Sequence, residues 1–100
     1  MSSTNTKGLS KHERKLVHTM QLLGDETRFK LFKLLSSKEE LCVSELAERL
    51  GITTSAVSQH FKTFELLGLV GKKRHGQRIC YSLNDSDETV KQIINFSLNL

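Results

Sequence analysis

The spacing of apolar residues divides the chain into seven segments. Over 9–23, 26–37, 45–50 and 54–67, apolar residues recur every three or four positions, as they do on one face of an α-helix. From 69 to 83, two short runs alternate around a His-Gly pair, a pattern typical of a β-hairpin. The segment from Glu88 is helical in spacing and apolar on more than one side. We therefore predict a mostly α fold with a small β-hairpin, in the order ααααββα.

Residues that commonly begin or end helices mark most of the boundaries. Gly24 and Gly68 are placed to end helices, and Gly51 is placed for a left-handed C-cap. Residues 41–43 are expected to form a short extended piece. The polar segment 1–8 is expected to be a disordered tip, leaving 9–100 as one domain. The expected N-caps are Asp25, Ser44, Thr53 or Thr54, and Asp85 or Ser86.

The third and fourth predicted helices have the layout of a helix-turn-helix. Leu46, Leu50 and Ile52 can pack between two crossing helices, and Gly51 permits the turn that joins them. On the fourth helix, Val57, Phe61 and Phe64 (i, i+4, i+7) are expected to face inward. The basic hairpin that follows completes a winged helix-turn-helix.

The opposite face of the fourth helix suits a DNA groove. It holds small hydroxyls, one amide and one cation, with no carboxylate before Glu65. Gln59 can make two hydrogen bonds to adenine, and Lys62 can neutralise a phosphate. The predicted DNA-binding residues are Thr53, Thr54, Ser55, Ser58, Gln59, Lys62, Lys73, Arg74, Gln77 and Arg78.

The charge distribution supports a polyanionic partner. The formal net charge is +4, and residues 53–78 carry five cations against one anion. A basic surface of this kind fits nucleic acid, although a solvated face or a protein–protein module with an acidic partner would share the pattern. The basic hairpin directly after the helix-turn-helix favours double-stranded DNA. No nucleophile, base and orienting group fall together, and no phosphate-binding glycine loop is present, so we expect neither an enzyme nor a cofactor.

Three stretches carry a family resemblance: "LGDETRFKLFKLL", "ELCVSELAERLGITTSAVSQHFKTFELLGLV" and "RHGQRICYSL". From about residue 23 to residue 83, the chain resembles the ArsR-type winged helix-turn-helix repressors. The resemblance implies a bacterial or archaeal homodimeric repressor that an inducer releases from DNA. Its first and last helices would pair the subunits. The fourth helix of each subunit, the recognition helix, would then fit one half of an inverted-repeat operator.

Metal sensors among these repressors carry either a Cys-x-Cys pair at the start of the first corner helix or Asp, His and Glu ligands on the last helix. Here Ser44 stands where the second thiol would be, and the chain after residue 75 has no histidine. Neither set of ligands is complete. We therefore predict no metal site, and weak binding of zinc or cadmium with little effect on DNA affinity.

Cys42 and Cys80 are a possible redox pair. If residues 41–43 pair with the second strand of the hairpin, both cysteines point to the same outer side of the sheet. Directly opposed strand residues lie about 4.5–5.5 Å apart at Cα, which a disulfide tolerates. The alternative is two unconnected reduced thiols, and it is favoured because disulfides are rare in the cytosol.

The chain shows no targeting or membrane signal. No apolar run approaches the roughly 20 residues that span a bilayer, and no signal peptide opens the sequence. The expected location is therefore the cytoplasm.

Overall fold

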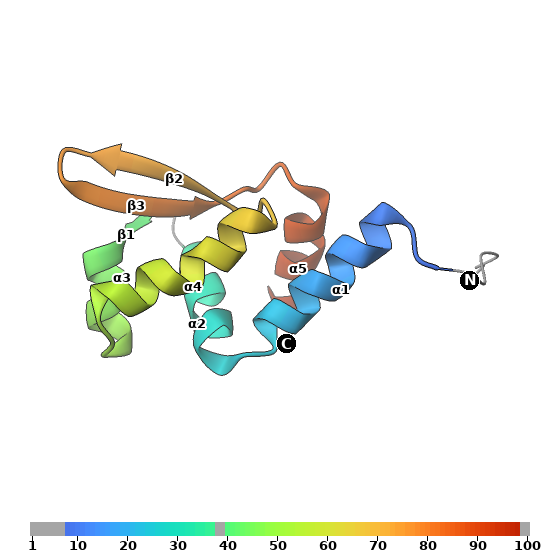
Figure 1. Cartoon of the computed structure of the whole chain (residues 1–100), viewed down its shortest axis with the longest axis horizontal. Helices are drawn as coiled ribbons and strands as arrows, with labels where there is room; N and C mark the ends of the chain where they lie inside the picture. The colour runs from blue at the N-terminus through green and yellow to red at the C-terminus, as the bar shows by residue number, and fades with distance from the viewer. Residues whose placement is uncertain (1–7, 38–39, 99–100) are drawn as a thin grey trace.

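The computed structural model describes residues 8–37 and 40–98, as Figure 1 shows. Apart from Gly8, the expected disordered tip lies outside the described residues. The predicted winged helix-turn-helix order is confirmed, with one short strand added before the third helix. The elements are α1 (Lys11–Leu23), α2 (Glu26–Ser36), β1 (Leu41–Cys42), α3 (Val43–Leu50), α4 (Thr54–Leu66), β2 (Val70–His75), β3 (Arg78–Leu83) and α5 (Glu88–Leu98).

Side-chain caps begin α1, α2 and α4. The Ser10 hydroxyl accepts a hydrogen bond from the Glu13 N–H at 3.0 Å, and Glu13 Oε1 accepts one from the Ser10 N–H at 2.9 Å. Asp25 accepts from the backbone of α2, and Thr53 accepts from Ala56, each at 3.0 Å. The predicted caps at Asp25 and Thr53 are therefore confirmed, and Thr54 is instead the first residue of α4.

Two other predicted caps are wrong. Ser44 lies inside α3, which begins at Val43 because β1 runs directly into the helix. Glu45 Oε1 there accepts a hydrogen bond from the Cys42 N–H at 2.9 Å. At α5, Asp87 Oδ1 accepts from the Val90 N–H at 3.1 Å, so the N-terminal carboxylate belongs to Asp87 rather than to Asp85 or Ser86.

The three strands form an antiparallel sheet in the order β1-β3-β2. His75 pairs with Arg78, so the hairpin turns through Gly76 and Gln77, one residue later than the expected His-Gly turn. Gly76 has a φ of 65°, a left-handed conformation that glycine adopts without a steric cost. The hairpin therefore consists of two six-residue strands joined by a two-residue turn.

The core lies between α4, the helices α2 and α3, and the inner side of the sheet. Val57, Phe61 and Phe64 are fully buried, which confirms the predicted inner face of α4. The Phe61 ring stacks on Tyr81 of β3 with centroids 4.2 Å apart and lies 5.0 Å from Phe64. These aromatic contacts attach α4 to the sheet and thereby set the position of its outer face.

Helices α1 and α5 lie together at the end of the molecule away from α3, as Figure 1 shows. The apolar stripe expected on the first helix, Leu16, Val17, Met20 and Leu23, is only partly buried. Leu16 and Leu23 are half-buried, whereas Val17 and Met20 are 40% and 58% exposed, and the buried residues of α1 are Thr19 and Leu22. Phe96 on α5 is 65% exposed. The reason is that α1 packs on the domain through a neighbouring face, which leaves much of its stripe without a covering element. This end of the chain therefore exposes apolar side chains from both terminal helices.

Candidate nucleic-acid interface

The corner between α3 and α4 is built by local backbone geometry. Gly51 adopts φ 67° and ψ 34°, the left-handed conformation predicted for it. The Ile52 N–H then donates to the Ala47 carbonyl at 3.1 Å, which closes the end of α3. Leu46 and Ala47 are buried beneath the turn. The glycine-centred corner therefore sets the direction in which α4 leaves.

The outer face of α4 is polar and open to solvent. Ser55, Gln59 and Lys62 follow one another at i, i+4 and i+7, and all three are exposed. Thr54 is exposed and Ser58 is half-buried. The Thr53 hydroxyl oxygen is already occupied as the cap of α4. Among the residues that the structure describes, the other polar side chains of this face have no hydrogen-bond partner and are open to a ligand.

The predicted cations of the wing, β2 and β3 with their turn, point to different sides. Lys73 is paired with Cys80 and Arg74 with Ile79, so the two adjacent side chains lie on opposite faces of the sheet. Both are exposed, as are Gln77 and Arg78. The wing therefore carries positive charge on both of its faces.

A groove of about 320 Å³ joins the wing to α4. Thr54 and Ser58 line it from α4, and Gln77 and Arg78 line it from the turn and the start of β3. The Arg78 guanidinium lies 3.8 Å from Glu45 Oε1 of α3. Four of the ten predicted DNA-binding residues thus meet at one groove, while Lys62 lies farther along α4 beside Glu65 and Leu66.

Comparison with known proteins places the chain in a family. Residues 25–72 match the family model described as "Bacterial regulatory protein, arsR family". The chain is 30% identical to the transcriptional activator HlyU of Vibrio cholerae, over 83% of this chain and 76% of HlyU. The chain belongs to the arsR family.

Other relatives of this arsR-family protein carry names of metal resistance. It is 36% identical over 72 residues to a cadmium resistance transcriptional regulatory protein CadC homolog of Staphylococcus aureus, a match that spans 58% of that relative's length. It is 30% identical to the arsenical resistance operon repressor of Bacillus subtilis, over 87% of this chain and 79% of the repressor. The structure of V. cholerae HlyU superposes with a TM-score of 0.77 at 31% identity, covering 88% of this chain and 92% of HlyU.

The two cysteines of this arsR-family chain form a disulfide. Cys42 of β1 lies directly opposite Cys80 of β3 in the sheet, and their sulfur atoms are bonded across a sequence separation of 38 residues. The favoured expectation of two unconnected thiols is therefore wrong for this structure. The bridge ties the strand that leads into α3 to the central strand of the sheet.

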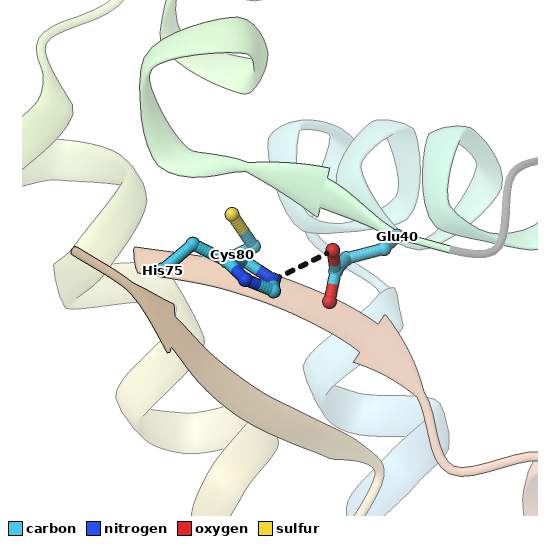
Figure 2. Close-up of side chains that lie close together, drawn as sticks. All are labelled: Glu40, His75 and Cys80. Atoms are coloured by element: carbon cyan, nitrogen blue, oxygen red, sulfur yellow. Dashed lines mark hydrogen bonds and ion pairs between the residues drawn. The ribbon is translucent and has the colours of Figure 1, made fainter. Parts of the chain in front are cut away.

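The sequence did not predict that Glu40 and His75 lie together. Figure 2 shows the His75 imidazole and the Glu40 carboxylate beside Cys80, with His75 Nε2 3.0 Å from Glu40 Oε1. One ligand atom from each of these three residues lies within 4.8 Å of the other two. The alternation of side chains along a strand does place Glu40 and Cys42 on one face. Finding His75 beside them also requires the register between β1 and β3, which the sequence does not give.

Three ionisable groups outside the groove of this arsR-family protein have shifted pKa values, and the first is Asp25, whose pKa is lowered mainly by the hydrogen bond that its carboxylate accepts from the Arg28 N–H. Burial alone would raise the pKa of Asp87, but hydrogen bonds from Lys15 of α1 and from the Val90 N–H outweigh it and hold the pKa below 3.8. Burial against α4, reinforced by Glu65, raises the pKa of Tyr81.

Within residues 8–37 and 40–98, no helix is long and apolar enough to cross a membrane.

Proposed function

We propose that this chain is a homodimeric transcriptional repressor that binds double-stranded DNA in a sequence-specific manner. The observation that carries the proposal is the groove in which Thr54 and Ser58 of α4 meet Gln77 and Arg78 of the wing. An exposed polar helix face and a basic hairpin at the same edge suit a DNA major groove with its flanking backbone.

The proposed contacts divide into two kinds. Gln59 lies mid-helix and exposed, where its amide can make two hydrogen bonds to an adenine edge. Ser55 and Ser58 flank it and can contact bases or phosphates, as can Thr53 and Thr54 at the helix start. Lys62, Lys73, Arg74 and Arg78 contact phosphates, with Gln77 at the tip. Because the wing is cationic on both faces, it fits between two phosphate backbones.

The dimer forms through α1 and α5. Met20 and Phe96 are large apolar side chains left 58% and 65% exposed at this end of the chain. A second copy of the chain would cover both. The two α4 helices would then face an inverted repeat whose half-site centres lie one DNA turn apart, about 34–36 Å, or a multiple of it.

An inducer or a redox signal releases the DNA. The Cys42–Cys80 bridge joins the entry of α3 to the base of the wing, so breaking it changes how firmly the wing is held relative to α4. Such a repressor works in the cytoplasm, where its operator lies, and no catalytic step is assigned to it.

Selection of bound sequences from a random duplex pool tests the proposal. The expected result is a single inverted repeat, bound by a dimer in sedimentation at micromolar concentration. Enrichment of no motif, or binding of a single half-site by a monomer, would contradict it. Binding to an acidic protein surface without any sequence-specific DNA binding would instead support an interaction module.

A further inference from the structure

We propose that reduction of the Cys42–Cys80 bridge opens a site for one thiophilic divalent metal ion, Zn²⁺ or Cd²⁺, with His75 and Glu40 as the other two ligands. Cys42 and Cys80 supply thiolates from β1 and β3, His75 supplies an imidazole nitrogen from the end of β2, and Glu40 supplies a carboxylate oxygen next to β1. This inference does not depend on DNA binding.

Three of the four ligand atoms already lie close together. The His75 nitrogen, a Glu40 oxygen and the Cys80 sulfur lie within 4.8 Å of one another, and the Cys42 sulfur is bonded to that of Cys80. Metal–ligand bonds of about 2.0–2.3 Å at tetrahedral angles require ligand atoms roughly 3.3–3.8 Å apart. The His75–Glu40 distance of 3.0 Å is close to that spacing. Reduction removes the bond between the two sulfurs, so that the Cys42 side chain can turn toward the ion while Cys80, His75 and Glu40 draw in from their spacing of up to 4.8 Å.

The sheet register explains why these residues meet. Cys42 is opposite Cys80, and Lys73, two residues before His75, is opposite Cys80 on the other side. Since side chains alternate along a strand, Glu40, Cys42, Cys80 and His75 all lie on the outer face of the sheet. Figure 2 shows Glu40 and His75 facing each other, with Cys80 beside the His75 ring.

The ligand chemistry selects the metal. Two thiolates with an imidazole and a carboxylate form a four-coordinate set of the kind that Zn²⁺ accepts, and thiolates favour soft metals over Mg²⁺ or Ca²⁺. Cys80 is fully buried and Cys42 nearly so, whereas the His75 and Glu40 side chains are 49% and 35% exposed. The thiolates are thus shielded from solvent, and the ion enters between the two exposed ligands.

The site differs from the two that the family resemblance suggests. Ser44 replaces the second thiol near the start of α3, and α5 carries no histidine. Here the missing ligands come instead from across the sheet. The proposal therefore departs from the sequence-based expectation of weak metal binding, and the titration below decides between them.

Oxidation and metal binding exclude each other in this arrangement. A dithiol reductant transfers two electrons and two protons to the bridge, which yields two thiols and the oxidised reductant. Metal binding then displaces both thiol protons into solvent. Hydrogen peroxide takes two electrons from the two thiolates, which reforms the bridge, consumes two protons, yields two waters and releases the ion.

Cadmium titration of the full chain without DNA tests the site. Protein reduced and freed of reductant under nitrogen is titrated with Cd²⁺ while the thiolate-to-cadmium absorption is followed, and competition with a chromophoric chelator gives the Zn²⁺ affinity. The test variants are His75→Ala and Glu40→Gln, which change exposed side chains and leave both thiols in place. The matched controls are His12→Ala and Glu48→Gln, exposed residues of α1 and α3.

We expect one ion per reduced chain and none per oxidised chain. Since even residues that only support metal ligands contribute about 10–100-fold to affinity, each test variant should lose at least about 10-fold while the controls keep the wild-type value. Co²⁺ in the reduced protein should give the intense visible absorption of a tetrahedral site. Absence of saturable binding, equal binding by the oxidised protein, or wild-type affinity in both test variants would overturn the proposal.

Discussion

Reduction of the Cys42–Cys80 bridge should strongly destabilise the fold. The two residues are 38 positions apart in the chain, so the bridge closes a long loop in the unfolded state. The loop-closure relation for a loop of this size gives about 4 kcal/mol of stabilisation at 25 °C. A domain of this length shifts its Tm by about 4–8 °C per kcal/mol, so reduction should lower the Tm by roughly 15–30 °C.

Urea and thermal unfolding of oxidised and reduced protein, both with a chelator to exclude metal, measure this difference. The Cys42→Ala/Cys80→Ala double variant is the matched control, because a dithiol should leave its Tm unchanged. Each protein is compared with itself, since Cys80 is fully buried and its truncation has a packing cost of its own. If the reduced wild-type chain, with two thiols confirmed by titration, unfolds at the same temperature as the oxidised chain, the bridge does not stabilise the fold in this way.

Three further predictions concern packing, DNA contacts and pH. Phe61→Ala should lower the free energy of unfolding by about 3–5 kcal/mol in urea denaturation, because Phe61 is fully buried and stacked on Tyr81. Arg78→Ala should weaken binding to all duplexes and flatten the slope of log K against log[salt] by roughly 0.9, whereas the control Lys91→Ala on α5 should leave the slope unchanged. Gln59→Ala should instead alter the selected DNA sequence. The pKa of Asp87 in the folded state lies below 3.8, so its contribution to stability is present above that pH and is lost as the pH falls through the folded-state pKa. Asp87→Asn should therefore make the free energy of unfolding less dependent on pH in this acid range.

Local signals determined most of the secondary structure. The i, i+4, i+7 spacing of Val57, Phe61 and Phe64 set the inner face of α4, and therefore also its outer face. Gly51 predicted the left-handed corner, because few other residues adopt that backbone conformation readily. The predictions of the helix caps were less accurate. The Glu45 carboxylate accepts a hydrogen bond from the Cys42 N–H, so α3 begins before Ser44. Several polar residues stand near each helix start, and sequence alone does not decide which of them caps.

The pairing of distant strands was decided only by the tertiary structure. Nothing in a local pattern brings Glu40 to within 3.0 Å of His75, because these residues are 35 positions apart and belong to different parts of the sheet. Their approach follows from the register of β1 against β3 and of β3 against β2, which the packing of Tyr81 on Phe61 helps to fix from the opposite face. The same register opposes Cys42 and Cys80. The sequence by itself therefore determined the recognition helix and the basic wing, whose signals repeat within a few residues, whereas the cluster at the base of the wing required the cooperative packing of segments far apart in the chain.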